Sequence, residues 1–427
     1  MTISRRHFAA RVTGLAGAAA MLGPGTLLGS EPDPCALPDP IRQLQTMTAG
    51  ARPIEDDERR ARIAKAQRLM TEQGIGAILL EPGTSMRYFT GVGWSLSERT
   101  FALVLPARGE PGWVCPAFEE ARARELIRFG HDVRTWEEDE SPFARIGGLL
   151  RDRGVATGRV GLEEQVRFLV VDGLRRDAAS AQVVSATPVT AGCRMLKSAA
   201  ELALMQRASD ITLAAFKAAL ATLREGMTQY DLSGNMMAAL RRVGGDDPWA
   251  LVGLGKSSAF PHGSVQPQRL REGDIVLLDA GCALHDYQSD ITRTTVFGKP
   301  TARQTEVWNL ERKAQDAAFA AAQVGATCES VDAAARQVIA AAGFGPGYRV
   351  PGLPHRTGHG IGMDGHEWSY FVRGNTTKLA PGMCFSDEPT IAIYGEFGIR
   401  LEDCLYITED GPRFFSAQSP AIDRPLA

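Results

Sequence analysis

The sequence has no excess of charge of either sign. Its 427 residues contain 47 Lys and Arg against 50 Asp and Glu, which leaves a formal net charge of -3 at pH 7. Loss of three arginines near the N-terminus (Arg5, Arg6 and Arg11) would lower this charge from -3 by three units, to about -6. Such a charge does not favour binding to phosphate backbones or anionic lipids. We therefore expect no nucleic-acid partner and a small substrate that is neutral or cationic.

Paired cysteines are also missing. The sequence has seven cysteines, an odd number, and they are scattered without any CxxC pair. This arrangement predicts neither a disulfide framework nor a zinc ribbon, so most of them are expected to be small buried hydrophobic residues. The seven are Cys35, Cys115, Cys193, Cys282, Cys328, Cys384 and Cys404.

Neither a repeat of fixed period nor an unusual composition occurs. Hydrophobic residues make up 44% and charged residues 23% of the sequence, which is typical of an ordinary soluble globular protein. At about 150 residues per domain, the length predicts two or three folded units.

The N-terminus has the features of an export leader. Arg5 and Arg6 are followed by Phe8 and a weakly apolar run rich in Ala and Gly, the pattern of a twin-arginine signal. A membrane anchor is the alternative, but glycines and Pro24 interrupt the run before it reaches the length of a membrane span. We expect residues 1–30 to be a signal peptide, with a periplasmic or secreted protein and no stable membrane insertion after its removal.

Two folded units are expected after the leader and a proline-rich linker over residues 31–53. Residues 54–190 alternate helical and strand-like patterns, beginning with a helix over 55–73 and a buried strand in IGAILL, and predict an α/β domain. Residues 191–427 combine short β-type segments with helices expected over 198–224, 230–243 and 302–324. The first of these helices is expected to carry Glu201 on a polar face.

Four acidic residues stand in or beside apolar β-type segments. Asp279 ends the expected strand DIVLLDAG, and Asp290 opens SDITRTTVF eleven residues later, so a hairpin-like connection would bring the two carboxylates together. Glu388 interrupts CFSDEPTIAI, and Glu402 interrupts GIRLEDCLYIT. A buried carboxylate without a partner is costly, so four such acids need cations.

His359 adds an imidazole to this set. It lies in HRTGHGIG, where the flanking glycines permit a close approach of the backbone to a site. Four carboxylates and one imidazole suit two divalent ions such as Mn, Co or Zn, about 3.5 to 4 Å apart and bridged by carboxylate and hydroxide. The sequence therefore predicts a two-metal centre.

The order of these motifs resembles one known family. The series LLDAG, YQSDITRT, TGHGIGMDGHE, SDEPTIAIYG and GIRLEDC is similar to the pita-bread metallopeptidases, which include proline dipeptidases, aminopeptidases P, methionine aminopeptidases and creatinases. The resemblance is strong over residues 190–427 and weaker over 55–190. It implies an α/β (α+β) fold, in which a pita-bread catalytic domain with a curved antiparallel sheet (191–427) follows a smaller creatinase-like α/β domain (54–190). It also implies a homodimer.

The resemblance assigns roles to the metal ligands. Asp279 would hold one metal ion, Asp290 and Glu402 would bridge both ions, and His359 and Glu388 would hold the second. Glu388 would also act as the general base for the bridging water. Two divalent ions per subunit are implied, with Mn as the first expectation and Co or Zn as alternatives.

Further residues match positions that contact substrate in this family. His262 and His366 would assist proton transfer and, with Glu388, are the expected catalytic residues. Arg400 would orient the carboxylates. The expected substrate-binding residues are His262, His355, His366 and Arg400.

The sequence departs from the family pattern beside the expected site. Asp387 stands where an apolar residue usually precedes the ligand glutamate, and Thr390 where a glycine is usual. Because side chains alternate along a strand, Asp387 is expected to face away from Glu388. Trp368 and Tyr370 lie in a segment where proline is common. These departures bear on substrate preference rather than on metal binding.

The leading functional hypothesis is a proline-specific exopeptidase. A hydroxide bridging the metals would attack the scissile carbonyl, and neutral imidazoles would protonate the leaving nitrogen of proline. The enzyme would be an Xaa-Pro dipeptidase or an Xaa-Pro aminopeptidase that acts on short peptides. One alternative is a C–N hydrolase of a small non-peptide molecule, like creatinase or ectoine hydrolase. The other is a nonenzymatic peptide-binding protein, which the intact ligand set disfavours.

Overall fold

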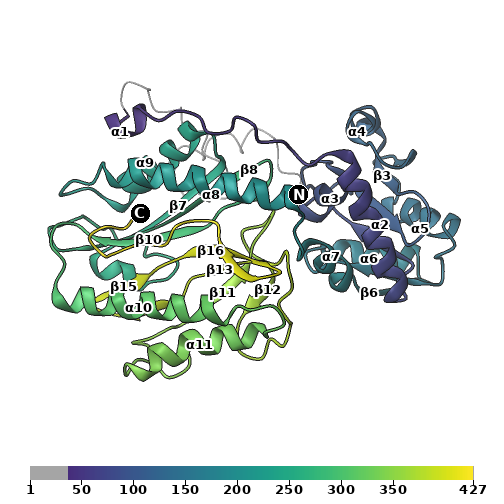
Figure 1. Cartoon of the computed structure of the whole chain (residues 1–427). Helices are drawn as coiled ribbons and strands as arrows, with labels where there is room; N and C mark the ends of the chain where they lie inside the picture. The colour runs from purple at the N-terminus through teal and green to yellow at the C-terminus, as the bar shows by residue number, and fades with distance from the viewer. Residues whose placement is uncertain (1–36, 427) are drawn as a thin grey trace, which may run out of the picture. The chain divides into compact units, whose positions relative to one another are not determined.

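Residues 37–426 are described by a computed structural model (Figure 1). The expected signal peptide and the start of the expected linker lie outside the described residues. The remainder of the expected linker is packed, because α1 (Asp39–Arg42) contacts helices α8 and α9 further along the chain and Ile41 is fully buried. The backbone N–H of Met47 donates to the carbonyl of Val243 at 2.8 Å. This stretch is therefore attached to the second part of the chain.

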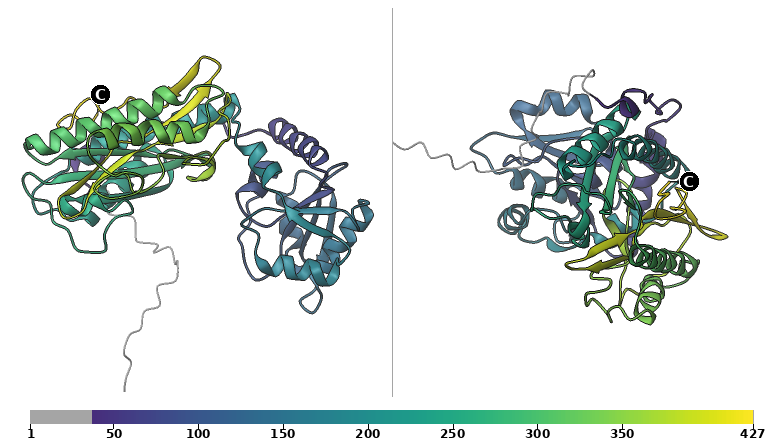
Figure 2. Two further views of the ribbon diagram at one scale, coloured as in Figure 1. Left: turned by 90° about the horizontal axis from the view of Figure 1, so that it is seen from below. Right: turned by 90° about the vertical axis from the view of Figure 1, so that its left-hand side faces the viewer.

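The first part of the described chain is a six-stranded mixed sheet with helices on both faces (Figures 1 and 2). Strand β1 runs parallel to β5 and antiparallel to β2. The strand order is β4 (Asp132–Trp136), β3 (Gly112–Pro116), β2 (Ala102–Pro106), β1 (Ala77–Leu80), β5 (Arg159–Leu162) and β6 (Gln182–Ser185). The helices are α2 (Asp56–Glu72), α3 (Thr84–Thr90), α4 (Glu120–Leu126), α5 (Pro142–Asp152), α6 (Phe168–Asp177) and α7 (Thr187–Arg194).

Both faces of this sheet are buried. Ala77 and Leu79 belong to a hydrophobic core that includes Ile146 of α5. Ile78 and Leu80, which alternate with them along β1, are also fully buried. A strand buried on both faces appears in the sequence as a continuous apolar run, which explains the segment IGAILL. The α/β prediction for this part of the chain is confirmed.

The second part of the described chain consists of antiparallel sheets covered by four long helices (Figure 1). Helices α8 and α9 pack on the first sheet, and α10 and α11 pack on each other and on the strands of the second. The helices are α8 (Ala199–Leu220), α9 (Gln229–Val243), α10 (Ala302–Ala321) and α11 (Cys328–Ala341). The predicted helices are confirmed, although α8 and α10 end earlier than expected. Among the described helices, none has the length and apolar character that crossing a membrane requires.

Three sheets make up this part of the described chain. In the first, β8 (Ile275–Leu284) lies between β10 (Ile291–Val296) and β7 (Asp246–Leu254), and β9 (Tyr287–Gln288) pairs with β8. The second has the order β12 (Glu367–Phe371), β11 (Gly358–Gly360), β13 (Cys384–Asp387), β16 (Asp403–Thr408) and β17 (Gly411–Phe414). The third pairs β14 (Thr390–Ile393) with β15 (Phe397–Arg400).

Three strand boundaries differ from the sequence-based expectation. The prediction that Asp279 ends a strand is wrong, because β8 continues past it to Leu284. The segment CFSDEPTIAI forms two strands, β13 and β14, since Pro389 after Glu388 has no N–H to donate to a ladder. The segment GIRLEDCLYIT is likewise divided, into β15 and β16, at Glu402. Both glutamates therefore lie where the chain passes from one sheet to another.

A buried polar network joins the first and second parts of the chain. Arg62 on α2 lies 3.1 Å from the carboxylate of Glu201 on α8 and donates to the hydroxyl of Tyr287 on β9 at 2.9 Å. The Tyr287 hydroxyl in turn donates to Glu201 at 2.7 Å. All three side chains are buried. Glu201 was expected on a polar face of its helix, but its side chain is buried and its charge is paired with that of Arg62. That expectation is therefore wrong.

Candidate metal centre

All of the predicted site residues line one cavity of about 480 Å³ in the second part of the chain. The acids come from the first sheet and from the breaks between strands, and the imidazole of His359 comes from β11. The structure therefore brings together Asp279, Asp290, His359, Glu388, Glu402, His262, His355, His366 and Arg400.

Strand pairing positions three of the four carboxylates. Strands β8 and β10 are antiparallel, with Asp279 opposite Thr292 and Ala280 opposite Ile291, so Asp290 lies beside Asp279. The expected hairpin-like connection is present, with β9 within it. An isolated bridge between Thr292 and Glu402 then brings the segment before β16 next to β10. Strand pairing thus brings acids that are far apart in the sequence close together, where the edges of two sheets meet.

His359 is oriented by its own strand. Its Nδ1 lies 3.1 Å from the carbonyl oxygen of Gly360, an arrangement in which Nδ1 carries the proton and donates. Its Nε2 then presents a lone pair to the acids, 3.2 Å from Glu388 Oε1 and 3.7 Å from Asp290 Oδ2. This is how a metal-binding histidine is usually held. Ligand atoms of Asp290, His359 and Glu402 lie within 4.8 Å of one another.

Negative charge in the cavity exceeds positive charge. Four carboxylates face two guanidiniums, those of Arg356 and Arg400, which leaves two negative charges in excess when His359 is neutral. One oxygen of Asp279 and one of Glu402 are buried without a hydrogen-bond partner in the described part of the chain. Two divalent cations would supply four positive charges and ligands for these oxygens. The residues present therefore fit a pair of divalent ions.

Burial and mutual repulsion shift the pKa values of these acids in the absence of cations. Burial raises the pKa of Asp290 well above its usual range, and the charge of Glu402 adds to the effect. Burial likewise raises the pKa of Glu402, with Glu388 adding to it. Burial alone would raise the pKa of Glu388 too, but in the metal-free site a protonated His359 donates to Glu388, and this hydrogen bond and charge lower that pKa. Glu388 is therefore the acid best able to remain ionised.

Thr292 is a site residue that the sequence reasoning missed. Its hydroxyl donates to Glu402 at 2.6 Å and accepts from the Nε of Arg400 at 3.0 Å. It stands two residues after Asp290 and therefore on the same side of the strand, a signal that would have identified it. Arg400 also forms an ion pair with Asp279. These contacts fit the orienting role expected for Arg400, while its contact with substrate stays a prediction.

The other three histidines of the cavity, besides His359, differ in how tightly their rings are held. His262 and His366 are exposed, and the His366 ring lies 3.8 Å from that of His359. Partial burial, followed by the charge of His359, lowers the pKa of His366 to about 4, so its imidazole is neutral at neutral pH. His355 has both ring nitrogens engaged, Nδ1 with the carbonyl of Arg356 at 2.7 Å and Nε2 with the hydroxyl of Thr390 at 3.0 Å. Thr390, which departs from the family pattern, thus anchors His355.

Asp387 lies among a second group of acids, away from the cavity. It is paired in register with Asp403 across β13 and β16, and both of its carboxylate oxygens lack a hydrogen-bond partner among residues 37–426. Burial, with Asp403 and Glu311 adding to it, raises the pKa of Asp387 well above its usual range. Asp403 is held by Arg293, whose Nη2 donates to it at 2.7 Å. The sheet thus separates the candidate ligands from a layer of buried acids behind them.

A close backbone contact at Gly281 holds Asp290 in place. A methyl group at this position would lie 2.0 Å from the carbonyl oxygen of Ser289, the residue before Asp290. We expect Gly281→Ala to displace that segment, at a cost of about 1–3 kcal/mol in the free energy of unfolding. Metal affinity, measured by competition with a chelator, should fall by roughly 10-fold or more.

The matched control for this variant is Gly234→Ala. Gly234 is exposed on α9, with nothing within 4 Å of an added methyl group. This variant should keep the metal affinity of the parent and gain about 0.5–1 kcal/mol of stability. Equal metal affinity in the Gly281 and Gly234 variants would show that the spacing of β8 and Ser289 does not position Asp290.

The sequence matches two family models, one in each part of the chain. Residues 203–409 match metallopeptidase family M24, and residues 62–196 match the creatinase/prolidase N-terminal domain. A probable dipeptidase, PepE, of Mycobacterium bovis is 34% identical over 366 residues, covering 85% of this chain and 95% of that protein. An Xaa-Pro dipeptidase of Lactobacillus delbrueckii subsp. lactis is 31% identical, covering 84% and 97%.

Solved structures show the same similarity in three dimensions. The dipeptidase PepE of Mycobacterium ulcerans has a TM-score of 0.81 at 32% identity, covering 88% of this chain and all (100%) of that one. A prolidase of Thermococcus sibiricus has a TM-score of 0.77 at 28% identity, covering 86% and 98%. These similarities confirm the expected fold class.

Proposed function

The chain belongs to metallopeptidase family M24, and from this premise we propose that it is a two-metal exopeptidase that hydrolyses the peptide bond beside proline in short peptides. One observation carries the proposal: four carboxylates, three of them buried and that of Glu388 partly buried, line one cavity with an imidazole, and they leave an excess of negative charge and unpartnered oxygens. The names of similar proteins, Xaa-Pro dipeptidase and prolidase, support a bond beside proline. Manganese is the proposed native metal, with cobalt and zinc as alternatives.

The residues of the chain fit the steps of such a reaction. Asp279, Asp290, His359, Glu388 and Glu402 would hold two divalent ions, which would acidify a water molecule and polarise the scissile carbonyl. The Glu388 carboxylate lies in the same cavity, where it would accept a proton from that water. His262 and His366, whose exposed imidazoles line this cavity, would relay a proton to the proline nitrogen as it leaves.

The alternatives are less well supported. A peptide-binding protein without metals does not need four carboxylates clustered around one imidazole, because burying such charges without cations is costly. A C–N hydrolase of small non-peptide molecules would use the same centre. The relatives described above carry peptidase names, which favours a peptide substrate.

A substrate panel tests the proposed function. Mature protein would be stripped with a chelator, reloaded with Mn, Co or Zn, and offered Xaa-Pro dipeptides, Xaa-Pro-Yaa tripeptides, a proline-free dipeptide, creatine and ectoine. We expect metal-dependent hydrolysis of the proline peptides only, and the ratio of dipeptide to tripeptide turnover would distinguish a dipeptidase from an aminopeptidase. Turnover of only the non-peptide substrates would support the alternative hydrolase.

We also propose export by the twin-arginine route and a homodimeric state. The first rests on Arg5, Arg6 and Phe8, and the second on the family resemblance. Cell fractionation of the parent and of a variant with both arginines replaced by lysine tests export, since the variant should remain in the cytoplasm. Sedimentation of the purified protein tests the dimer, and a mass near 46.0 kDa would contradict it.

A further inference from the structure

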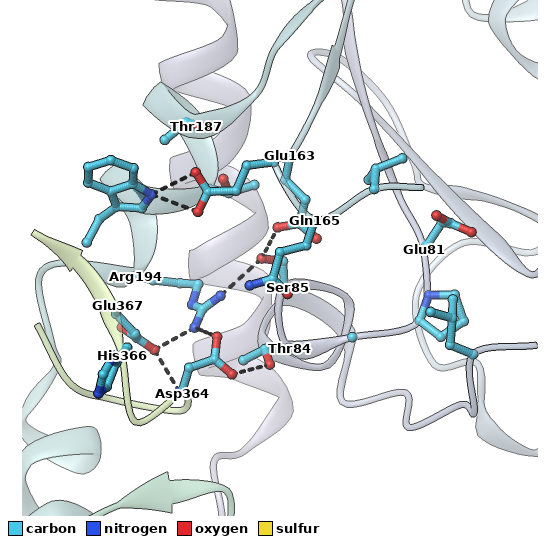
Figure 3. A pocket seen from close by; sticks show the side chains of 18 of the residues that line it. Glu81, Thr84, Ser85, Glu163, Gln165, Thr187, Arg194, Asp364, His366 and Glu367 are labelled. Carbon is cyan, nitrogen blue, oxygen red and sulfur yellow. Dashed lines mark hydrogen bonds and ion pairs between the residues drawn. The ribbon is translucent and has the colours of Figure 1, made fainter. Parts of the chain in front are cut away.

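A second cavity of about 130 Å³, drawn in Figure 3, lies next to the cavity of the candidate metal centre. His366 lines both cavities, and its ring lies 3.8 Å from that of the candidate ligand His359. The volume is well above the roughly 10–15 Å³ that one water molecule needs, so the cavity has room for a side chain. Because His366 borders both cavities, a ligand group in the second cavity would be separated from the candidate metal centre by this one side chain.

One wall of this cavity comes from neighbouring parallel strands of the first sheet. The loop after β1 contributes Glu81, the first turn of α3 contributes Ser85, and the loop after β5 contributes Glu163 and Glu164. Sheets with parallel strands and helices on both faces bind ligands at the carboxyl ends of their strands. The position of the cavity in the fold is therefore that of a ligand site.

Three acids of the cavity are already neutralised. Glu81 pairs with Arg167 at 2.6 Å. Arg194 lies between Asp364 and Glu367 and pairs with both (Figure 3). Lys197 also pairs with Glu367, at 3.1 Å, so three cations balance the three acids and these pairs contribute no net charge.

The other two acids have no cationic partner within residues 37–426. Glu163 accepts a hydrogen bond from the hydroxyl of Ser85 at 2.6 Å, and Glu164 accepts from the indole N–H of Trp368 at 2.9 and 3.1 Å. These neutral donors fix the carboxylates in place, and the guanidinium of Arg194, which donates to the same Ser85 hydroxyl at 3.3 Å, compensates part of the charge of Glu163. Burial raises the pKa of Glu163, so a cation beside it would be stabilising. The cavity therefore favours a cationic ligand.

Aromatic rings complete the lining. Trp368 and Tyr370 of β12 have ring centroids 5.0 Å apart, and both line the cavity. The guanidinium of Arg356 already lies over the Tyr370 ring, 4.2 Å from its centroid. Trp368, beside Glu164, is therefore the ring suited to an amphipathic cation, which has an apolar stem and a charged tip. Both aromatic residues belong to the segment that departs from the family pattern. The preference they create is thus expected to be particular to this chain.

We propose that this cavity selects peptides with a lysine or arginine residue before proline, with Glu163 and Glu164 receiving the cationic tip and Trp368 contacting the stem. The assignment to the residue before proline rests on the proposed function, because this is the side chain that varies in an Xaa-Pro peptide. The overall negative charge of the chain is consistent with a cationic substrate.

Two dipeptides of similar length test the proposal. Lys-Pro and Met-Pro share the α-ammonium group and differ in side-chain charge, so their ratio of kcat/KM reports the side chain alone. The metal-loaded parent should prefer Lys-Pro by about three- to tenfold, and added salt should reduce this preference. Glu164→Gln and Glu163→Gln should each lower kcat/KM for Lys-Pro and leave Met-Pro unchanged.

Glu110→Gln is the matched control. Glu110 is exposed in the loop between β2 and β3, away from the cavity, and its variant should keep the preference of the parent. An equal loss for both dipeptides in the Glu163 and Glu164 variants would show that these acids bind the α-ammonium group instead, and would overturn the proposal. So would a parent enzyme that prefers Met-Pro.

A binding measurement separates this inference from the proposed function. If the metal-loaded parent hydrolyses neither of these dipeptides nor the Xaa-Pro-Yaa tripeptides of the substrate panel, the proposed function fails. Calorimetric titration of the same protein with Lys-Pro and Met-Pro then tests whether the cavity binds the cationic side chain. Tighter binding of Lys-Pro that is lost in Glu164→Gln would support the cation site, and equal binding of the two dipeptides would overturn it.

Discussion

Glu402→Gln should lower kcat for the preferred proline peptide by roughly 10³-fold or more and remove at least one bound metal ion. Glu402 is almost fully buried, one of its carboxylate oxygens has no partner in the described chain, and the other accepts from Thr292. An amide at this position removes a negative charge and presents an N–H₂ group where a cation has to bind. The variant should keep its fold, because the side chain keeps its size.

Metal content per chain and kcat are the two measurements for this variant. Glu409→Gln, an exposed glutamate between β16 and β17, is the matched control and should retain both. Full metal content with full activity in Glu402→Gln would show that Glu402 is not a ligand. Peptide binding without metal or activity, in the parent and the variant alike, would favour the nonenzymatic alternative.

Arg293→Met should lower the free energy of unfolding by about 3–5 kcal/mol. Arg293 is 1% exposed, and its guanidinium donates to the carboxylate of Asp403 and to the carbonyls of Glu402 and Ala417, the last two at 2.8 Å each. Methionine fills similar space but leaves Asp403 as a buried acid without its cation. The midpoint of urea unfolding, measured with metals bound, reports the loss.

Two further variants show whether the lost ion pair is the cause. Arg293→Met combined with Asp403→Asn removes both charges and should recover part of the stability, since the cost comes mainly from the charge left alone. Arg413→Met alters an exposed arginine of β17 and should change stability by less than about 0.5 kcal/mol. A double variant that is less stable than Arg293→Met alone would mean that packing, rather than charge, is responsible.

Local patterns were sufficient to predict much of the candidate site. Acids within apolar segments and a histidine between glycines identified the five candidate ligands, because such residues are costly to bury without a cation. Strand alternation predicted that Asp387 faces away from Glu388, and the same rule would have placed Thr292 beside Asp290. Pro389 was an unused signal for the break between β13 and β14.

Contacts between distant segments could not be predicted in this way. Thr292 and Glu402 are 110 residues apart, and Glu164 and Trp368 are 204 apart, so no periodicity of the sequence connects them. The burial of Glu201 also depends on a distant partner, Arg62. Within the sequence of its own helix, Glu201 looks like any other polar residue, so its burial could not be predicted there. In each case the partner is brought close by the tertiary fold, which local propensity does not determine.

The contact of Arg62 with Glu201 and Tyr287 limits how this chain can be recombined with its relatives. In a chimera that joined the second part of the chain to another N-terminal domain, Glu201 would contact the residue that replaces Arg62. A neutral residue there would leave a buried carboxylate without its cation and weaken the junction. The two parts are therefore compatible only as a matched pair, and an exchange of domains has to carry Arg62 and Glu201 together.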